Sequence, residues 1–352
     1  MTTISVSSLD DLKLVLPNAI STPLPVSKIN KIRVHHSGKF IAINFSFKND
    51  KIFIFSEPIG DACELIQVLN LDSPSDFAFS PTADLLAVVT NRGDACMYDL
   101  SSPSRFTRIQ FDRFISASFS AVTFSKDGEM LVIVSDSQLV VVEKREKIWK
   151  QTKPVLDFAH SDFVTDIAIH PEKCAVAVAS TNERGILIVG IPGYKIQVQE
   201  ILRVKPIEHE RGVAASPLAS PCGQSKHLNP NILNFIPSRG FPIACVWSPY
   251  GEMLAIGTSD NLITLWNISA SSCETLALDE GIVIREIFFI ADSVLVVVPS
   301  DDSKIICINI DDGVMFENDL GGAKTLCGGD LRRGVVYRPR GRDVISRFKL
   351  TV

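Results

Sequence analysis

One pattern of hydrophobic and polar positions recurs six times along the chain. An apolar run is followed by a short turn rich in Ser, Pro, Asp and Gly, then by a second apolar run, a polar turn and a third alternating run. Short apolar runs that are rich in Val and Ile and bounded by turn residues predict β-strands. The six units begin with the segments IRVHHSGKFIAINF, FAFSPTADLLAVVT, VTFSKDGEMLVIVS, IAIHPEKCAVAVAS, CVWSPYGEMLAIGT and IFFIADSVLVVVPS.

The units are evenly spaced, with one exception. Their third residues are Val34, Phe79, Phe124, Ile169, Trp247 and Phe289. The first three spacings are 45 residues and the last is 42, whereas the fourth is 78. One blade of a propeller takes about 40–45 residues. Runs such as LLAVV and VLVVV are apolar on both faces, as expected of small sheets that stack on one another. We therefore predict an all-β chain that forms one domain over residues 1–352.

The third strand of each unit ends at a constant offset, and this position carries a family resemblance. The predicted ends are Phe55–Ser56, Tyr98–Asp99, Val142–Glu143, Gly190–Ile191, Trp266–Asn267 and Ile308–Asn309. They match the Trp-Asp position of WD repeats. WSPYGEMLAIGTSDNLITLWN and FSPTADLLAVVTNRGDACMYDL are most similar to that family. The resemblance covers nearly the whole chain and implies a β-propeller, but a fold of this kind does not specify a function.

The resemblance implies structural roles for His160, Trp247, Trp266 and Asp99. Only one unit has Trp at the signature position, Trp266, and only one has a His before its first strand, His160. In the family, that His belongs to a hydrogen-bonded network with a strand Ser or Thr and a turn Asp. Because most units lack it, we expect apolar packing to hold most blades together.

We expect seven blades in a ring that strands from both chain ends close. The seventh blade is assigned to the C-terminal stretch TLCGGDLRRGVVYRPRGRDVISRFKL. A strand from the N-terminus, either Leu12–Leu16 or the ISVSSL segment before it, is expected to complete this blade and so remove an exposed sheet edge. Six blades, or eight with a degenerate blade inside the insertion, are the alternatives.

The long spacing places an insertion between blades at residues 205–240. This segment contains five prolines and many Ser, Gly and Asn residues, and it shows neither strand nor helix periodicity. We expect a flexible loop there. Long loops on rigid scaffolds often carry function, but a surface insertion is also tolerated at little cost. His209 and Arg211 are its candidate partner-binding residues.

Composition and motifs argue against catalysis and against a bound cofactor. The eight cysteines form no C-x-x-C pair and the six histidines show no metal-ligand spacing, so we expect no metal site. His35 and His36 are interpreted as turn residues. No phosphate-binding glycine loop or nucleophile elbow is present, and the paired Asp residues fall in polar turns. A net charge of −5 argues against general nucleic-acid binding.

The N-terminus does not resemble a signal peptide, and no apolar run reaches the roughly 20 residues of a membrane-spanning helix. The expected location is therefore intracellular, in the cytoplasm, the nucleus or both. A membrane anchor or a further domain outside this chain stays open.

A basic stretch near the C-terminus is the strongest candidate for a binding site. Its principal residues are Arg332, Arg333, Arg338, Arg340 and Arg342. In an extended segment the last three side chains would point to one side. Arginine forks suit carboxylate or phosphate partners. The alternative is a set of solvated loops paired with acidic turns.

These observations favour a non-catalytic scaffold or adaptor subunit that binds other proteins of a complex. The first alternative is a module that uses the C-terminal arginines to bind an anionic ligand, namely a phosphoinositide, a phosphopeptide or nucleic acid. Leu331–Gly334 resembles the phosphoinositide-binding motif of the PROPPIN propellers, although that motif precedes further blades there. Ala159–Glu172 resembles a blade of the ER-anchored exchange factor for the Sar GTPase, so a small-GTPase exchange factor is a further alternative.

Overall fold

The structure is a computed structural model of the 352-residue chain. It describes residues 5–8, 12–15, 29–45, 51–56, 62–102, 106–109, 118–135, 138–145, 148–151, 156–157, 164–172, 175–181, 185–191, 232–238, 240–270, 272–300, 304–319, 329–330, 335–339 and 344–351. Within these ranges every regular element is a β-strand, and there is no helix. The prediction of an all-β chain is confirmed.

Five of the six sheets are built from consecutive strands with antiparallel pairing. The second repeat forms β7 (Pro74–Phe79), β8 (Leu85–Thr90), β9 (Ala95–Asp99) and β10 (Phe106–Arg108). The third forms β11 (Phe119–Phe124), β12 (Met130–Ser135), β13 (Gln138–Arg145), β14 (Ile148–Gln151) and β15 (Leu156–Asp157). The fourth forms β16 (Val164–Ile169), β17 (Ala175–Ser180), β18 (Gly185–Gly190) and β19 (Ile232–Pro237). The fifth forms β20 (Pro242–Trp247), β21 (Met253–Thr258), β22 (Leu262–Asn267) and β23 (Ser272–Ala277), and the sixth forms β24 (Ile284–Ala291), β25 (Val294–Pro299), β26 (Lys304–Asn309) and β27 (Met315–Asp319).

The remaining sheet has nine strands and joins both ends of the chain. One group is the first repeat, with β3 (Ile29–Val34), β4 (Phe40–Phe45), β5 (Lys51–Ser56) and β6 (Ala62–Asn70). The other group contains β28 (Gly329–Asp330), β29 (Val335–Pro339), β30 (Val344–Thr351), β1 (Ser5–Ser8) and β2 (Leu12–Val15). Strand β30 pairs antiparallel with both β1 and β2, and β2 pairs in parallel with β6.

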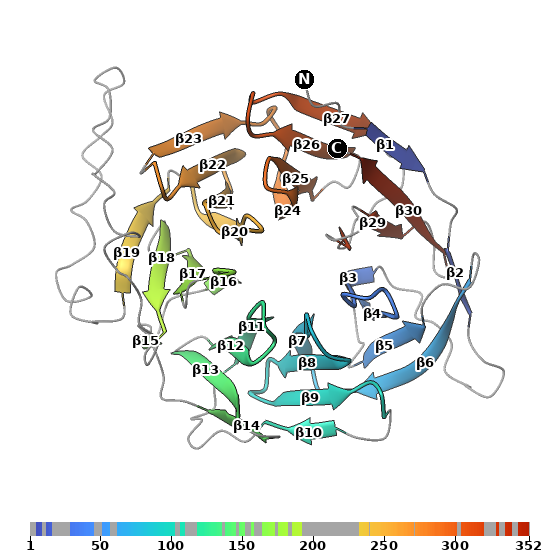
Figure 1. Cartoon of the computed structure of the whole chain (residues 1–352). Coiled ribbons are helices and arrows are strands. Elements are labelled where there is room, and N and C mark those ends of the chain that lie inside the picture. The colour runs from blue at the N-terminus through green and yellow to red at the C-terminus, as the bar shows by residue number, and fades with distance from the viewer. Residues whose placement is uncertain are drawn as a thin grey trace.

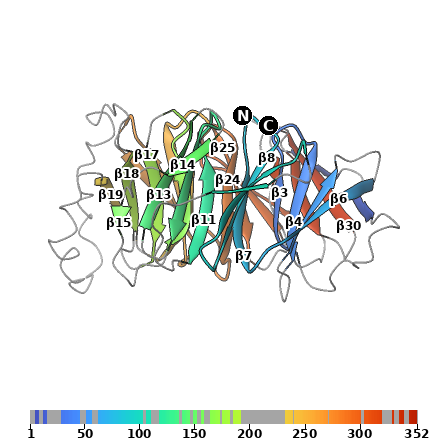
Figure 2. The ribbon, with the colours of Figure 1, turned by 90° about the horizontal axis from the view of Figure 1, so that it is seen from below.

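The sheets are arranged around a common axis, with the first strand of each repeat innermost (Figure 1). Seen from the side, the strands run between two faces of the molecule (Figure 2). We call one of these the first-turn face, because it holds the turns between the first and second strands, such as 35–39 and 248–252. The opposite side, where the chain crosses from one sheet to the next, is the crossover face. This all-β arrangement is consistent with a WD-repeat β-propeller.

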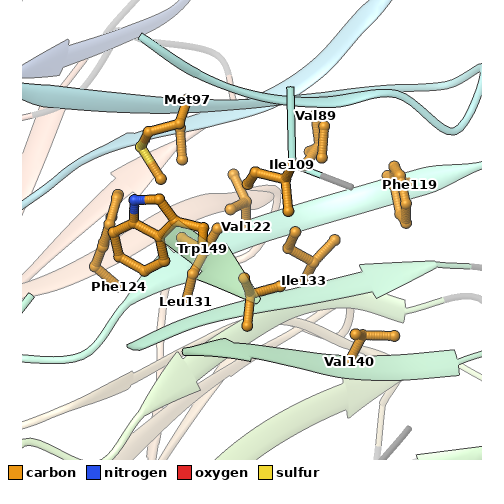
Figure 3. Packing of buried hydrophobic residues seen from close by; sticks show 13 residues of the cluster. Val89, Met97, Ile109, Phe119, Val122, Phe124, Leu131, Ile133, Val140 and Trp149 are labelled. Carbon is orange, nitrogen blue, oxygen red and sulfur yellow. The ribbon is translucent and has the colours of Figure 1, made fainter. Parts of the chain in front are cut away.

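Apolar side chains fill the space between successive sheets. Figure 3 shows the cluster between the β7–β10 and β11–β14 sheets. In it the rings of Trp149 and Phe124, both from the β11–β14 sheet, pack edge to face with their centroids 5.8 Å apart. In the second strands of the repeats nearly every residue is buried, as in AVAVAS of β17. A strand buried on both faces needs a neighbouring sheet on each side, and this is why these sheets stack.

Each repeat contains a fourth, outer strand that the sequence pattern did not reveal. Most of these strands are short or rich in polar residues, as in SCETLA of β23, which is largely exposed. An edge strand that faces solvent needs no continuous apolar run, so its signal is weak. Strand β19 lies inside residues 205–240, where we expected only a loop, and it pairs with β18. The loop expectation is wrong for Ile232–Pro237, and residues 205–231 lie outside the described residues.

All six first strands carry an irregularity of register at the same position. The shifts fall between residues 29/31, 74/76, 119/121, 164/166, 242/244 and 284/286. The extra residues include Ser75 and Ser120, whose hydroxyls donate to carbonyls of the second strand in their own sheets, and Thr165, whose hydroxyl donates at 2.9 Å to the carbonyl of Pro242 in the next sheet. A β-bulge re-aims the side chains beside it. Here the bulges precede the charged residues described next.

Candidate functional site: the charged axis and the two faces

Five charged side chains from four first strands interact at the common axis of the sheets. Lys31 and Arg33 come from β3, and Asp76, Asp166 and Glu286 come from β7, β16 and β24. Lys31 forms an ion pair with Asp76, and the Arg33 guanidinium lies 2.9 Å from a Glu286 oxygen. Arg33 also interacts electrostatically with Asp76 and Asp166. The cluster therefore links strands that are up to 253 residues apart in sequence.

Two of these carboxylates connect successive sheets through backbone hydrogen bonds. Asp76 accepts from the N–H of Phe77 at 2.7 Å and, in the next sheet, from the N–H of Val122 at 3.0 Å. Asp166 accepts in the same way from Ile167 at 2.9 Å and from Cys245 at 3.0 Å. Because both oxygens are used, these carboxylates serve as acceptors that fix the spacing of neighbouring first strands.

Burial and mutual attraction shift the protonation of this cluster. Burial raises the pKa of Asp166 to about 6, against the opposing effects of its two N–H donors and of Lys31. Burial disfavours the charged form of Arg33, but Glu286, Asp76 and Asp166 together outweigh it and raise the Arg33 pKa. In the described residues, no group of three or more His, Cys, Asp and Glu side chains has the geometry of a metal site. The axis is thus an ion-pair network between sheets.

This network was not predicted from the sequence. Its only visible signal is a charge at one repeat position in otherwise apolar strands, because Lys31 and Asp76 are 45 residues apart and Asp166 follows 90 residues later. The pairing itself depends on how the sheets are arranged around the axis, since each contact joins residues of different sheets.

The first-turn face is held by contacts that pass from one sheet to the next. His36 Nδ1 donates to the carbonyl of Ser80 at 3.1 Å, and the Thr82 hydroxyl donates to the carbonyl of Asp127 at 3.1 Å. In the fifth and sixth sheets, the N–H of Tyr250 donates to Asp292 at 3.2 Å. Neighbouring turns are therefore tied together by hydrogen bonds.

His35 illustrates how tightly these turns are built. It is fully buried, its Nε2 donates to the carbonyl of Ala83 in the next sheet at 3.2 Å, and its Nδ1 accepts from the Ser37 hydroxyl at 2.8 Å. Burial lowers the His35 pKa, although the Ala83 bond and Asp84 oppose the shift. The turn interpretation of His35 and His36 is confirmed.

Exposed large hydrophobic residues concentrate on two adjacent sheets. Seven such side chains occur among the described residues, and five of them lie within residues 241–315. These five are Phe241, Tyr250, Val283, Val314 and Met315. Phe241 and Val283 stand at the starts of first strands on the crossover side, whereas the other three belong to the first-turn face.

The same sheets hold much of the negative charge. Residues 240–319 contain 13 of the 40 carboxylates but only two of the 35 Lys and Arg residues. Their net charge is therefore −11, while the rest of the chain carries +6. The two cations, Arg285 and Lys304, lie near the crossover ends of β24 and β26.

The residues with expected structural roles lie at contacts between or within sheets. Trp247 is buried, and its indole Nε1 donates to the carbonyl of Ala168 in the preceding sheet at 3.1 Å. Trp266 is buried in the same cluster. Asp99 accepts from the N–H and the hydroxyl of Ser101, which closes the turn after β9. His160 lies outside the described residues.

One part of the expected family network is visible in the fifth sheet. The strand hydroxyl of Thr258 donates to the turn carboxylate of Asp260 at 2.5 Å. In the fourth sheet, the buried hydroxyl of Ser180 has no hydrogen-bond partner among the described residues.

The candidate arginines are only partly described. Arg338 lies in β29, opposite Ser346 of β30. The other candidate partner-binding residues lie outside the described residues; they are Arg332, Arg333, Arg340, Arg342, His209 and Arg211.

Comparison with known families supports the resemblance seen in the repeats. Residues 235–267, which run from β19 through β22, match the model of the WD40 family, described as WD domain, G-beta repeat. The chain thus contains a WD repeat, and the suspected membership of the WD-repeat family is supported. None of the curated proteins matches the chain. Among the described residues, no helix is long and apolar enough to span a membrane.

Proposed function

We propose that this protein is a non-catalytic interaction scaffold, an adaptor subunit that binds other proteins of a complex. The observation that carries the proposal is the WD repeat at residues 235–267 within a set of sheets tied to one another at the axis and at the first-turn face. WD-repeat domains generally mediate protein–protein interactions. A rigid frame of this kind lets surface turns bind partners without a large ordering cost.

We further propose that the sheets form a closed ring of seven blades. The nine-stranded sheet would contain two blades, β3–β6 and β28–β30 with β1 and β2. Both predicted N-terminal segments, Leu12–Leu16 and ISVSSL, contribute strands that pair with β30, which supports closure by the two chain ends. The parallel β2–β6 pair would then join the last blade to the first.

The chemistry of the axis supports a binding role over a catalytic one. Asp76 and Asp166 are engaged by backbone N–H groups, and Arg33 and Glu286 are engaged with each other. A general acid or base needs a proton-accepting atom within reach of substrate. These carboxylates instead complete contacts between sheets.

Affinity purification of the full chain followed by mass spectrometry tests the scaffold proposal. We expect a defined set of proteins to copurify in stoichiometric amounts and to be lost when the fold is disrupted by Gly251→Ala. Purification as a monomer with no stoichiometric partner, at physiological salt, would count against the scaffold.

Binding of an anionic ligand by the C-terminal arginines is the second candidate. The antiparallel register sets Arg347 of β30 opposite Tyr337 and Lys349 opposite Val335, so basic residues occur on both strands. The positive net charge outside residues 240–319 favours the same assignment. Phosphate-driven binding weakens steeply with salt. Charge reversal at Arg338, Arg340 and Arg342 should abolish binding to phosphoinositide vesicles, and unchanged binding would exclude this role.

We further propose an intracellular location, in the cytoplasm, the nucleus or both, on the basis of the scattered cysteines in the sequence, none of which forms a C-x-x-C pair. Imaging of the tagged full chain tests this. Nothing among the described residues favours the exchange-factor alternative.

A further inference from the structure

The first-turn face of the fifth and sixth sheets combines exposed apolar side chains with exposed carboxylates. Tyr250 is 64% exposed, and Val314 and Met315 are each 42% exposed. The carboxylates of Glu252, Asp311 and Asp312 are exposed on the same turns, and Asp292 is partly exposed. These two sheets, β20–β23 and β24–β27, are neighbours at the top of the ring in Figure 1.

Hydrogen bonds hold these turns in a fixed relation to one another. The N–H of Tyr250 donates to Asp292, which joins the turn after β20 to the turn after β24. The N–H of Ile310 donates to the carbonyl of Ser293 at 2.8 Å, and this joins the turn after β24 to the turn after β26. The turn after β26 is closed by a bond from the Asn309 N–H to the Val314 carbonyl at 2.9 Å. The surface from Tyr250 to Val314 is therefore one rigid unit.

The backbone beneath Tyr250 restricts its position further. Gly251 follows it with φ +76° and is buried against the ring of His170. The Tyr250 ring thus projects from a turn whose conformation is set by its neighbours. A preorganised aromatic side chain of this kind loses little conformational entropy on binding and is a frequent hot spot of protein interfaces.

The negative charge on this face favours a positively charged partner. The turns of these two sheets on the first-turn face carry the four carboxylates of Glu252, Asp292, Asp311 and Asp312, whereas the two cations of residues 240–319, Arg285 and Lys304, lie toward the crossover face. Lys304 is in addition held by Glu317 at 2.6 Å. Acidic surfaces repel nucleic acids and anionic membranes and attract cationic protein segments.

We propose that this surface, centred on Tyr250, Val314 and Met315, docks a protein segment whose apolar side chains are flanked by Lys or Arg. The proposal rests on the scaffold function and names the class of partner and the place where it binds. Apolar side chains of the partner cover Tyr250, Val314 and Met315, and its cations face Glu252, Asp311 and Asp312. The contact is electrostatically steered, so its on-rate falls as salt rises.

A defined probe tests the surface directly with the full chain. The probe is a short labelled peptide in which Leu and Phe alternate with Lys and Arg, and its counterpart has Glu in place of every basic residue. Fluorescence anisotropy measures both. We expect the basic peptide to bind, to weaken as salt rises from about 50 to about 200 mM, and to bind better than the acidic peptide.

Matched variants locate the binding. Tyr250→Ser, and separately Asp311→Asn with Asp312→Asn, should each weaken the basic peptide at least about tenfold, a size expected for a hot spot. Ile148→Ser is the control, because Ile148 is 70% exposed but belongs to the β11–β14 sheet. It should change neither affinity nor melting temperature.

Three results would overturn the proposal: equal binding of the two peptides, unchanged affinity in Tyr250→Ser and in the Asp311 and Asp312 variant, or loss of binding only in Phe241→Ser on the crossover face. Affinity purification from cells distinguishes failure of the docking surface from failure of the scaffold function. If the Tyr250→Ser chain keeps its copurifying partners, the scaffold stands and the docking surface does not.

Discussion

The indole Nε1 of Trp247 donates a hydrogen bond to the carbonyl oxygen of Ala168 at 3.1 Å, across the boundary between the fifth and fourth sheets. The centroid of the Trp247 ring also lies 4.7 Å from that of the His170 ring in the neighbouring fourth sheet. One side chain thus contributes both apolar packing and a polar contact to the interface. Contacts of this kind determine how rigidly neighbouring sheets are held against each other.

Replacing Trp247 with Phe should destabilise the fold more than replacing Trp266 with Phe. Both changes remove similar buried ring volume, but only Trp247→Phe removes a hydrogen bond, the one to the Ala168 carbonyl, whose net contribution is about 0.5–1.5 kcal/mol. The Trp266 indole N–H is buried with no partner among the described residues, so its loss breaks no such bond. Urea denaturation measures both variants. An equal or larger loss in Trp266→Phe would contradict the role of the Ala168 bond.

Gly251→Ala should be severely destabilising. A Cβ at this position would lie 2.3 Å from a His170 ring carbon, and φ is +76°, where side chains other than Gly are strained. Gly313 is the matched control, because its φ is +69° and a Cβ added there would have no atom within 4 Å. Gly313→Ala should cost only the backbone strain of about 1–2 kcal/mol. Similar melting temperatures for the two variants would show that the His170 contact is absent.

Acidification should stabilise the wild-type chain relative to Asp166→Asn. The pKa of Asp166 is about 6 in the folded state and 3.8 without the fold, so between these values the folded state binds the proton more tightly. The free energy of unfolding of the wild-type chain, minus that of the variant, therefore increases as pH falls from about 7 to about 4, by at most about 3 kcal/mol.

Thermal unfolding over this pH range measures the difference. Any effect of His35 cancels, because both chains contain it. A difference that is constant with pH would mean that Asp166 is not buried as described.

The repeat spacing and the strands that it predicts agree closely with the structure, because two-sided burial leaves a plain apolar pattern. Strands β5, β9, β22 and β26 end at or beside the expected residues. The outer strands were not predicted, since an exposed edge such as β23 carries no such pattern.

The axial network could not be derived from the sequence for a different reason. A single Lys or Asp in a strand says nothing about its partner, and Arg33 meets Glu286 only because the sheets are arranged around an axis at which β3 and β24 lie close together. The acidity of residues 240–319, in contrast, is a property of the sequence alone. This acidity points to a binding surface only because the structure places Tyr250 and Asp311 on the same face.

The corrected boundary of the insertion gives a further prediction. Deleting residues 208–229 should change the free energy of unfolding by less than about 1 kcal/mol, because loop-closure entropy varies slowly with length. Deleting residues 208–236 also removes most of β19, the outer strand of the fourth sheet, and should destabilise the fold strongly. Chemical denaturation compares the two chains. Equal stabilities would show that β19 contributes nothing.

The pairing of the two chain ends is the most direct test of the closed ring that the scaffold requires. The register aligns Ser7 of β1 with Lys349 of β30, and paired strands bring Cα atoms within the range that a disulfide spans. We expect the Ser7→Cys, Lys349→Cys chain to form an intramolecular disulfide in the monomer on oxidation, detected as a cross-linked peptide by mass spectrometry. The control pair Ser7→Cys, Arg145→Cys, which joins different sheets, should form none. Absence of the Ser7–Lys349 cross-link, or its formation only between chains, would contradict a ring closed by its own ends.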